Sequence, residues 1–364
     1  MRKRDRERPC RLSSPSGDDC GEFAGAGFQP PLVIKLLSMT SHENTSNVSH
    51  RIAVIGCGHV GASVAYALLL SGFAREIVLL DSDPRHAEGE AMDLQHAVPL
   101  SRPVRVWAGD YSDAARAHIA VIAAGVGSHR GESRLDLLGR NVLVVNDCLR
   151  RLMDAGFDGI VLMTTNPVDI LAQVAQEVSG LPVGRVIGSG TVLDTARLRA
   201  MLGTALGMEA RSIHAYIIGE HGDSEIAAWS AAHVAGVPLK DYCASVAPSC
   251  PDFDDLLGRV RRAAPEIIER KGHTSYAIAS CVVRICEAVL RDEHTVLPVS
   301  TMTHGQYGIE GVYLSLPCVV GTGGVERVIE LPLDEQEREG LRASAAVLQR
   351  TLDSLRRAAT ARPA

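Results

Sequence analysis

The strongest constraint on the fold is a glycine-rich turn after the first apolar run of a long α/β pattern. The stretch "IAVIGCGHVGASVAYALL" at 52–69 places Gly56, Gly58 and Gly61 in G-x-G-x-x-G spacing between a strand-like run and a helical pattern. In such a unit the first glycine makes the tight turn, the second lets backbone approach a pyrophosphate, and the third lets helix pack closely on strand. The turn therefore predicts a dinucleotide site.

An acid after the next predicted strand favours NAD as the dinucleotide. The run "EIVLLD" at 76–81 ends at Asp81, 20 residues beyond Gly61, where a carboxylate accepts hydrogen bonds from the ribose 2′-hydroxyl. Asp81 and Asp83 would repel a 2′-phosphate, which disfavours NADP. The alternative is that Asp81, like Ser82 and Asp83, only caps the following helix.

Further apolar runs at 119–125 and 159–167 alternate with helical patterns. Continuous apolar strands separated by helices are typical of a parallel sheet covered on both faces. We therefore expect an α/β fold, with a doubly wound (Rossmann) domain over 51–190. Beyond it, longer helical segments and shorter strands predict a mixed α+β substrate domain over 191–358, which ends in an amphipathic helix.

The first fifty residues differ in composition from the rest of the chain. They are rich in Ser, Pro, Gly and Arg and show no sustained period, so we expect a disordered extension over 1–50. An alternative is that Met39 is the true first residue. No cleavage signal follows the N-terminal arginines, and no apolar run reaches the roughly 18 residues that span a bilayer.

Charge and cysteine usage exclude several classes of function. With 37 basic and 43 acidic residues the formal net charge is −6, so we expect no nucleic-acid partner. The nine cysteines are scattered and form no CxxC pair, which indicates neither a disulfide framework nor a metal site. A reducing cytoplasm is the expected location.

Four separate stretches, one of them "TTNPVDIL" with Asn166, place charged or polar residues in apolar or glycine-rich settings. Together they contain what hydride transfer to a 2-oxo acid requires. In "IIGEHGDSE", His221 can give and take a proton near neutral pH. Asp194 can orient the imidazole and stabilise its charged form. Arg197 can hold a carboxylate with two hydrogen bonds. Arg134, after the glycine-containing "GVGSHRGESR", can bring positive charge as a lid closes.

Each of these residues also has an ordinary structural reading. Arginines are mostly solvated, buried histidines are commonly satisfied within the fold, and aspartates commonly cap helices. A nucleotide-binding protein without catalysis is the rival hypothesis from another class. Such a protein would be free to lose any of the four charged residues, whereas all four are present here.

The motifs taken together resemble the lactate and malate dehydrogenase family, and within it the L-lactate branch. The resemblance rests on "IGCGHVGAS", "AAGVGSHRGESRLDLLGRN", "TTNPVDIL", "VIGSGTVLDTARLR", "HAYIIGEHGDSE" and "KGHTSYAIA", and it covers residues 51 to 358. It implies NADH-dependent reduction of pyruvate to L-lactate and assembly as a homotetramer. It also implies roles for six residues: His221 as acid and base, Asp194 as its partner, Arg197 as carboxylate clamp, Arg134 on the lid, and Asn166 and Thr274 beside nicotinamide and substrate.

One lid position departs from the family pattern. Six residues before Arg134 the family carries Gln in lactate enzymes and Arg in malate enzymes, whereas this chain has Ser128. Serine cannot pair with a second carboxylate, and it leaves room beside a methyl group. Pyruvate remains the preferred substrate in our interpretation, a bulkier 2-oxo acid is the next, and oxaloacetate, the malate-forming substrate, is the third.

A possible activator site also follows from the resemblance. In allosteric bacterial members of the family, residues matching Arg199 and His214 bind fructose 1,6-bisphosphate at a subunit interface. Arginine and protonated histidine both suit a phosphate. Members without this regulation can carry the same pair, so activation and its absence both stay open.

Overall fold

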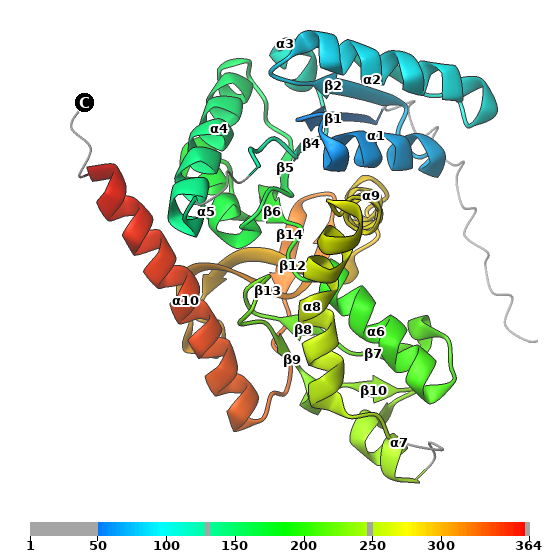
Figure 1. The fold of residues 1–364 in the computed structure, drawn as a ribbon, viewed down its shortest axis with the longest axis vertical. Coiled ribbons are helices and arrows are strands. Elements are labelled where there is room, and N and C mark those ends of the chain that lie inside the picture. The colour runs from blue at the N-terminus through cyan, green and yellow to red at the C-terminus, as the bar shows by residue number, and fades with distance from the viewer. Residues whose placement is uncertain (1–49, 128–131, 246–249, 361–364) are drawn as a thin grey trace, which may run out of the picture. The chain divides into compact units, whose positions relative to one another are not determined.

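The structure is a computed structural model that describes residues 50–127, 132–245 and 250–360. The extension expected over 1–50 lies outside these residues, apart from His50. A nine-stranded sheet runs through the described chain, and helices cover both of its faces (Figure 1). Its strand order is β14-β13-β12-β6-β5-β4-β1-β2-β3.

Six parallel strands form the first part of this sheet. Their order, β3-β2-β1-β4-β5-β6, reverses direction between β1 and β4, so a crevice forms there at the carboxyl ends of the strands. This order confirms the doubly wound arrangement expected from the sequence. The strands are β1 Arg51–Ile55, β2 Glu76–Leu80, β3 Arg105–Ala108, β4 Ile119–Ile122, β5 Ile160–Met163 and β6 Val186–Gly188.

The connecting helices begin where local side chains satisfy their first backbone N–H groups. Asp83 caps α2 by accepting a hydrogen bond from the backbone N–H of Arg85 at 3.0 Å, and Pro84 occupies the first helical position. Ser133 caps α4 through the backbone N–H of Asp136. The helices of this part are α1 His59–Ser71, α2 Pro84–Ala97, α3 Tyr111–Ala114, α4 Arg134–Asp154 and α5 Val168–Ser179.

Three antiparallel strands extend the same sheet beyond β6. They are β12 Thr295–His304, β13 Glu310–Gly321 and β14 Gly324–Val328. The sequence predicts a second α and β unit, and the structure shows that its long strands continue the first sheet. The join lies where Ser300 of β12 pairs with Gly188 of β6. A Cβ atom added to Gly188 would lie 2.8 Å from the Cβ of Ser300, so only glycine permits this approach.

Most of the remaining elements pack over one end of the sheet, whereas α9 packs against α1, and α10 packs along α5 and β13. Helices α6 and α8 contact each other, and their apolar side chains share a small core with strands β7 and β10. The elements are α6 Val192–Leu206, β7 Ile213–His214, β8 Ile217–Ile218, β9 Ile226–Ala227, β10 His233–Val234, β11 Val237–Pro238, α7 Leu239–Ser245, α8 Phe253–Lys271, α9 Tyr276–Leu290 and α10 Glu335–Thr360.

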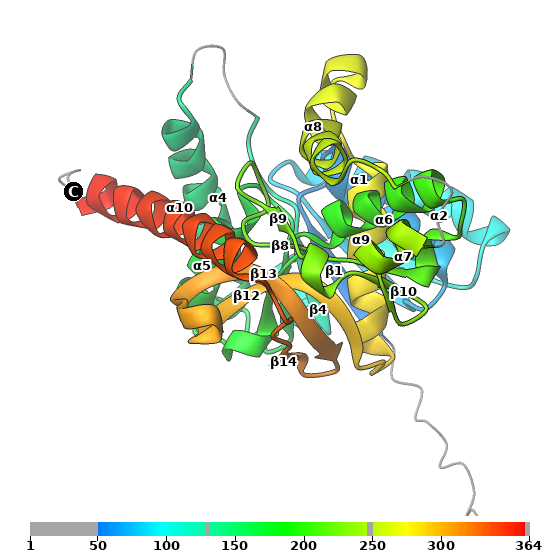
Figure 2. The same cartoon turned by 90° about the horizontal axis from the view of Figure 1, so that it is seen from below.

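The main core lies on both faces of the sheet. In β1, Ile52 and Val54 face the core under α1 and α9, while Ala53 and Ile55 face the core under α4 and α5. Helix α10 runs along α5 and β13 in both views (Figures 1 and 2). Burial on both faces explains why these strands read as continuous apolar runs. Across the described ranges, no helix combines the length and apolar content needed to cross a membrane.

Candidate active site

The glycine turn has the geometry that its three predicted roles require. Gly56 has φ +96°, and an added Cβ would lie 2.4 Å from the backbone nitrogen of Ala124. At Gly61 an added Cβ would lie 1.8 Å from the carbonyl oxygen of Gly56. The helix can therefore approach the turn this closely only because residue 61 has no side chain. Around Gly58 the space within 4 Å of an added Cβ is open. An incoming pyrophosphate therefore has room at Gly58.

Asp81 lies at the carboxyl end of β2, beside this turn. Its Oδ2 accepts a hydrogen bond from the backbone N–H of Cys57 at 2.7 Å, and its Oδ1 accepts one from the backbone N–H of Asp83 at 3.1 Å. Burial opposes ionisation, but these hydrogen bonds hold the pKa of Asp81 below its ordinary value. The carboxylate and Gly58 line a cavity of about 550 Å³, which fits the ribose-binding role of an NAD site.

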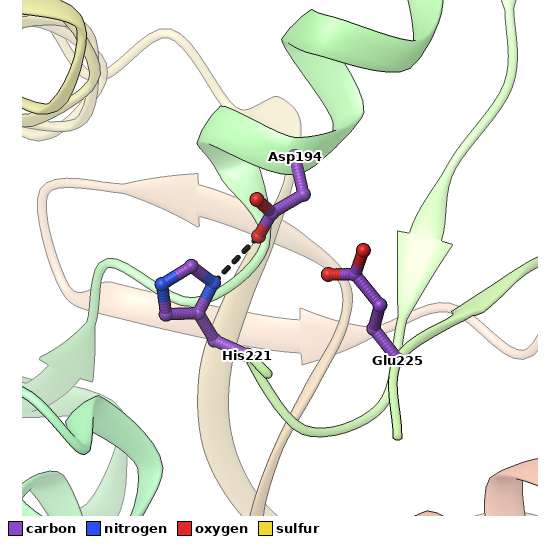
Figure 3. A group of neighbouring side chains, drawn as sticks. All are labelled: Asp194, His221 and Glu225. Atoms are coloured by element: carbon purple, nitrogen blue, oxygen red, sulfur yellow. Dashed lines mark hydrogen bonds and ion pairs between the residues drawn. The ribbon is translucent and has the colours of Figure 1, made fainter. Parts of the chain in front are cut away.

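His221 and Asp194 form a close pair (Figure 3). His221 follows β8 in a loop, whereas Asp194 lies in the first turn of α6. The Nδ1 of His221 lies 2.6 Å from Oδ2 of Asp194, and their side chains are 24 % and 3 % exposed. Burial lowers the pKa of His221, but the Asp194 carboxylate outweighs burial and raises it to about 9. Among the described residues, the ring of His221 makes this one hydrogen bond, through Nδ1.

Asp169 holds the backbone of His221 and was missed by sequence reasoning. Its Oδ2 accepts a hydrogen bond from the backbone N–H of His221 at 2.8 Å, and its Oδ1 accepts one from the Ser300 hydroxyl at 2.6 Å. Burial raises the pKa of Asp169 to about 6. An acid inside the apolar helix "PVDILAQVA" is the signal that could have found it, since carboxylates are rarely buried without partners.

Arg197 lies on the same face of α6 as Asp194, as its three-residue spacing predicts. Its Nη1 donates to Oδ1 of Asp194 at 2.8 Å, and its side chain is 13 % exposed. Together, His221 and Arg197 hold the pKa of Asp194 below its ordinary value in spite of burial. The structure thus brings three of the four predicted charged residues into one network.

Glu225 is a second acid that sequence reasoning missed. It lies at the far end of the loop that begins with His221, and its carboxyl points toward the space between His221 and Asp194 (Figure 3). One ligand atom from each of these three residues lies within 4.8 Å of the others. An acid four residues after the histidine, just before the apolar "IAA", was the available signal.

The other predicted site residues are spread around this network. Asn166 is exposed after β5 and forms a cis peptide bond with Pro167. Thr274 is half-buried in the turn between α8 and α9. Arg134 is the first residue of α4, but its side chain lies outside the described part of the chain, as does all of Ser128. Their predicted roles in substrate binding stay predictions.

The predicted activator residues lie on α6 and β7. Arg199 donates from Nε to the carbonyl oxygen of Ala215 at 2.9 Å, and its guanidinium lies 4.8 Å from the ring centre of Tyr216. His214 is exposed and stacks on His233 with 4.9 Å between ring centres. Burial, His233 and Arg199 together lower the pKa of His214.

Two family models match nearly all of the described chain. One, described as lactate/malate dehydrogenase NAD binding domain, matches residues 50–188. The other, described as lactate/malate dehydrogenase alpha/beta C-terminal domain, matches residues 191–358. The boundary between the two matches falls between β6 and α6.

Curated relatives and solved structures agree with this match. An L-lactate dehydrogenase from Priestia megaterium is 48 % identical over 306 residues, which are 84 % of this chain and 96 % of that protein. One from Acetivibrio thermocellus is 44 % identical over 86 % of this chain and 99 % of its own. The crystal structure of a lactate dehydrogenase from a deep-sea metagenome library has a TM-score of 0.83 at 44 % identity, covering 84 % of this chain and 99 % of that one. The minor L-lactate dehydrogenase of Enterococcus mundtii has a TM-score of 0.82 at 40 % identity, covering 84 % and 98 %.

Proposed function

Because the chain belongs to the lactate/malate dehydrogenase family, we propose that it is an NAD-dependent L-lactate dehydrogenase that reduces pyruvate to L-lactate. One observation carries the proposal: Nδ1 of His221 is engaged by Asp194 at 2.6 Å, which leaves Nε2 to exchange a proton with substrate. The naming of the curated relatives as L-lactate dehydrogenases supports it.

The proposed mechanism assigns proton transfer to His221. Bound NADH supplies the hydride. The His221 imidazolium donates its Nε2 proton to the carbonyl oxygen of the substrate, and Asp194 stabilises the charge before transfer. In lactate oxidation, neutral His221 takes the proton back.

Two arginines are assigned to the substrate in this proposal. Arg197 turns its guanidinium toward the substrate carboxylate, because a planar fork matches a carboxylate with two hydrogen bonds. Arg134 adds positive charge near the carbonyl oxygen as the lid excludes water. Asn166 and Thr274 border the nicotinamide and the substrate.

Gly56, Gly58, Gly61 and Asp81 hold the cofactor in this proposal. The open space at Gly58 and the ionised carboxylate of Asp81 support a pyrophosphate and a ribose at these positions. Asp81→Ala should weaken NADH binding measured by fluorescence titration. Unchanged affinity would remove Asp81 from the site.

The deciding experiment compares kcat/KM for pyruvate, oxaloacetate and a bulkier 2-oxo acid, with NADH at saturation. A preference for pyruvate supports L-lactate dehydrogenase. A preference for the bulkier acid would follow from the shorter side chain of Ser128, and a preference for oxaloacetate would make the protein a malate dehydrogenase. Ser128→Gln should sharpen the preference for pyruvate, and no gain over bulkier acids would contradict this role of Ser128.

Activation by fructose 1,6-bisphosphate at Arg199 and His214 is a further part of the proposal. The cationic guanidinium and the stacked, exposed histidine support an anion site that strengthens as pH falls. Pyruvate saturation measured with and without the sugar bisphosphate tests it, and identical curves would remove the activator. A cytoplasmic homotetramer is the expected form, which sedimentation of the purified protein tests.

A further inference from the structure

Glu225 is a buried acid that the proposed chemistry does not use. Its residue exposure is 2 %, and its Oε1 makes no hydrogen bond within the part of the chain that the structure describes. Its backbone is held on both sides: the N–H donates to the Gly222 carbonyl oxygen at 3.3 Å, and the carbonyl oxygen accepts a hydrogen bond from Arg261. The main chain of Glu225 is therefore anchored, whereas its buried Oε1 has no hydrogen-bond partner among the described residues.

The surroundings of this carboxyl are charged. Asp194 and His221 act on it from α6 and from its own loop, Arg197 acts from α6, and Arg261 acts from α8. Asp169 acts on His221 from α5. A second carboxylate so near Asp194 is unfavourable, and so is burial of an unpaired charge. Both effects favour the neutral, protonated form of Glu225.

Binding of a metal ion by Asp194, His221 and Glu225 is a less favourable interpretation of this cluster. Asp194 already accepts from Arg197 at 2.8 Å and faces Nδ1 of His221 at 2.6 Å. A metal ion there would have to displace both contacts and would lie close to a guanidinium. A proton on Glu225 therefore balances the charges of this network better than a bound metal ion does.

We propose that Glu225 is a positioning residue that acts through the His221–Asp194 pair. When its carboxyl ionises beside His221, the negative charge raises the pH at which the imidazolium loses its proton, and this sets the upper pH limit of 2-oxo acid reduction. The proposal rests on the proposed function. As pH rises, the carboxyl near Asp194 loses its proton, and the new anion faces the His221 imidazolium. That anion makes the imidazolium harder to deprotonate, so the protons leave in steps that belong to the group.

The pKa values of Glu225 and His221 are both raised, so each group holds its proton to a higher pH than it does in water. Burial, followed by the negative charge of Asp194, raises the pKa of Glu225 to about 8. The pKa of His221 is raised to about 9 by Asp194 and, to a smaller extent, by Asp169 and Glu225. Both groups therefore lose their protons in the alkaline range, in coupled steps.

The test is the pH profile of kcat/KM for pyruvate with NADH at saturation. Glu225→Gln keeps the shape of the protonated acid but cannot ionise. We expect its alkaline limb to move down by roughly one pH unit, so that activity near pH 9 relative to that near pH 6.5 falls about fivefold against wild type. Glu225→Asp retains a carboxyl and should retain the wild-type limb.

Glu220→Gln is the matched control. Glu220 precedes His221 in the same loop and accepts a hydrogen bond from Ser224. It is not among the largest influences on the pKa of His221, whereas Glu225 is. We expect the alkaline limb of its kcat/KM profile to coincide with that of wild type. A Glu225→Gln profile that also coincides with wild type would overturn the proposal.

A direct titration covers the case in which Glu225→Gln does not fold. The ring resonances of His221 in the wild-type protein should titrate in two steps, whereas a single step would overturn the proposal. A wild-type protein that reduces no 2-oxo acid would refute the proposed function itself. An active wild type whose His221 titrates independently of Glu225 refutes only this inference.

Discussion

Replacing Asp194 by Asn should convert His221 from a charged to a mostly neutral residue at neutral pH. The ordinary pKa of histidine is 6.5 and that of His221 is about 9, a difference that corresponds to about 3 kcal/mol in favour of the imidazolium. Without the carboxylate at 2.6 Å, burial lowers the pKa of His221 and only the weaker influences of Asp169 and Glu225 oppose it, so the pKa should return to about 6.5. At about pH 7.5 only about one tenth of the molecules would then hold the proton needed for pyruvate reduction.

The assay for Asp194→Asn is kcat/KM for pyruvate across the pH range, followed by NADH absorbance. We expect a loss of at least about tenfold near pH 7.5 and a smaller loss near pH 5.5. Asp255→Asn, at a 55 % exposed position on α8, is the control and should match wild type. An Asp194→Asn profile with the wild-type alkaline limb would refute the view that this carboxylate sets the charge of His221.

Three further predictions concern the fold. The Gly61→Ala variant should lose about 3 kcal/mol or more of unfolding free energy in urea, because the new Cβ would meet the Gly56 carbonyl oxygen at 1.8 Å. The Gly58→Ala variant should fold normally and bind NADH more weakly. Equal stability of the two variants would contradict this prediction. The Leu149→Ala variant removes a side chain with 0 % exposure and should cost about 3 kcal/mol in the same measurement. A loss below about 1 kcal/mol would mean that neighbouring side chains move in to fill the cavity. The raised pKa of His221 stabilises the fold fully below about pH 6.5, and this stabilisation is lost as pH rises through about 9. The contribution of His221 to the free energy of unfolding should therefore fall by roughly 2 to 3 kcal/mol over that interval. Glu225, whose pKa is also raised, adds a fall of its own, so His221→Asn should make the wild-type curve shallower, and a curve parallel to wild type would contradict this.

Local patterns were enough to predict the parallel sheet and its glycine turn. The contact of Gly61 with the carbonyl oxygen of Gly56 lies within one strand–turn–helix unit, so spacing alone predicts it, whereas the approach of Gly56 to Ala124 joins distant segments. The Asp194–Arg197 contact was predictable for the same reason, since three residues separate its partners on one helix.

Contacts between distant segments could not be predicted in this way. Asp169 meets His221 across 52 positions and Ser300 across 131. Glu225 shows its importance only once α6 places Asp194 beside its loop. Such juxtapositions depend on how β12 and β13 dock on β6, and no periodicity in a single sequence encodes that docking.

The shared strand pairing at Gly188 and Ser300 has a consequence for building hybrids of this protein with its relatives. The two family matches meet at 188–191, which looks like a natural place to splice one relative to another. Yet Ser300, from the second match, pairs with Gly188 from the first and also hydrogen-bonds Asp169, the residue that anchors His221. A hybrid that brings a larger residue to position 188, or loses the hydroxyl at position 300, would therefore disturb the anchoring of His221. The boundary between the two family matches thus lies among contacts to which residues of both matched regions contribute.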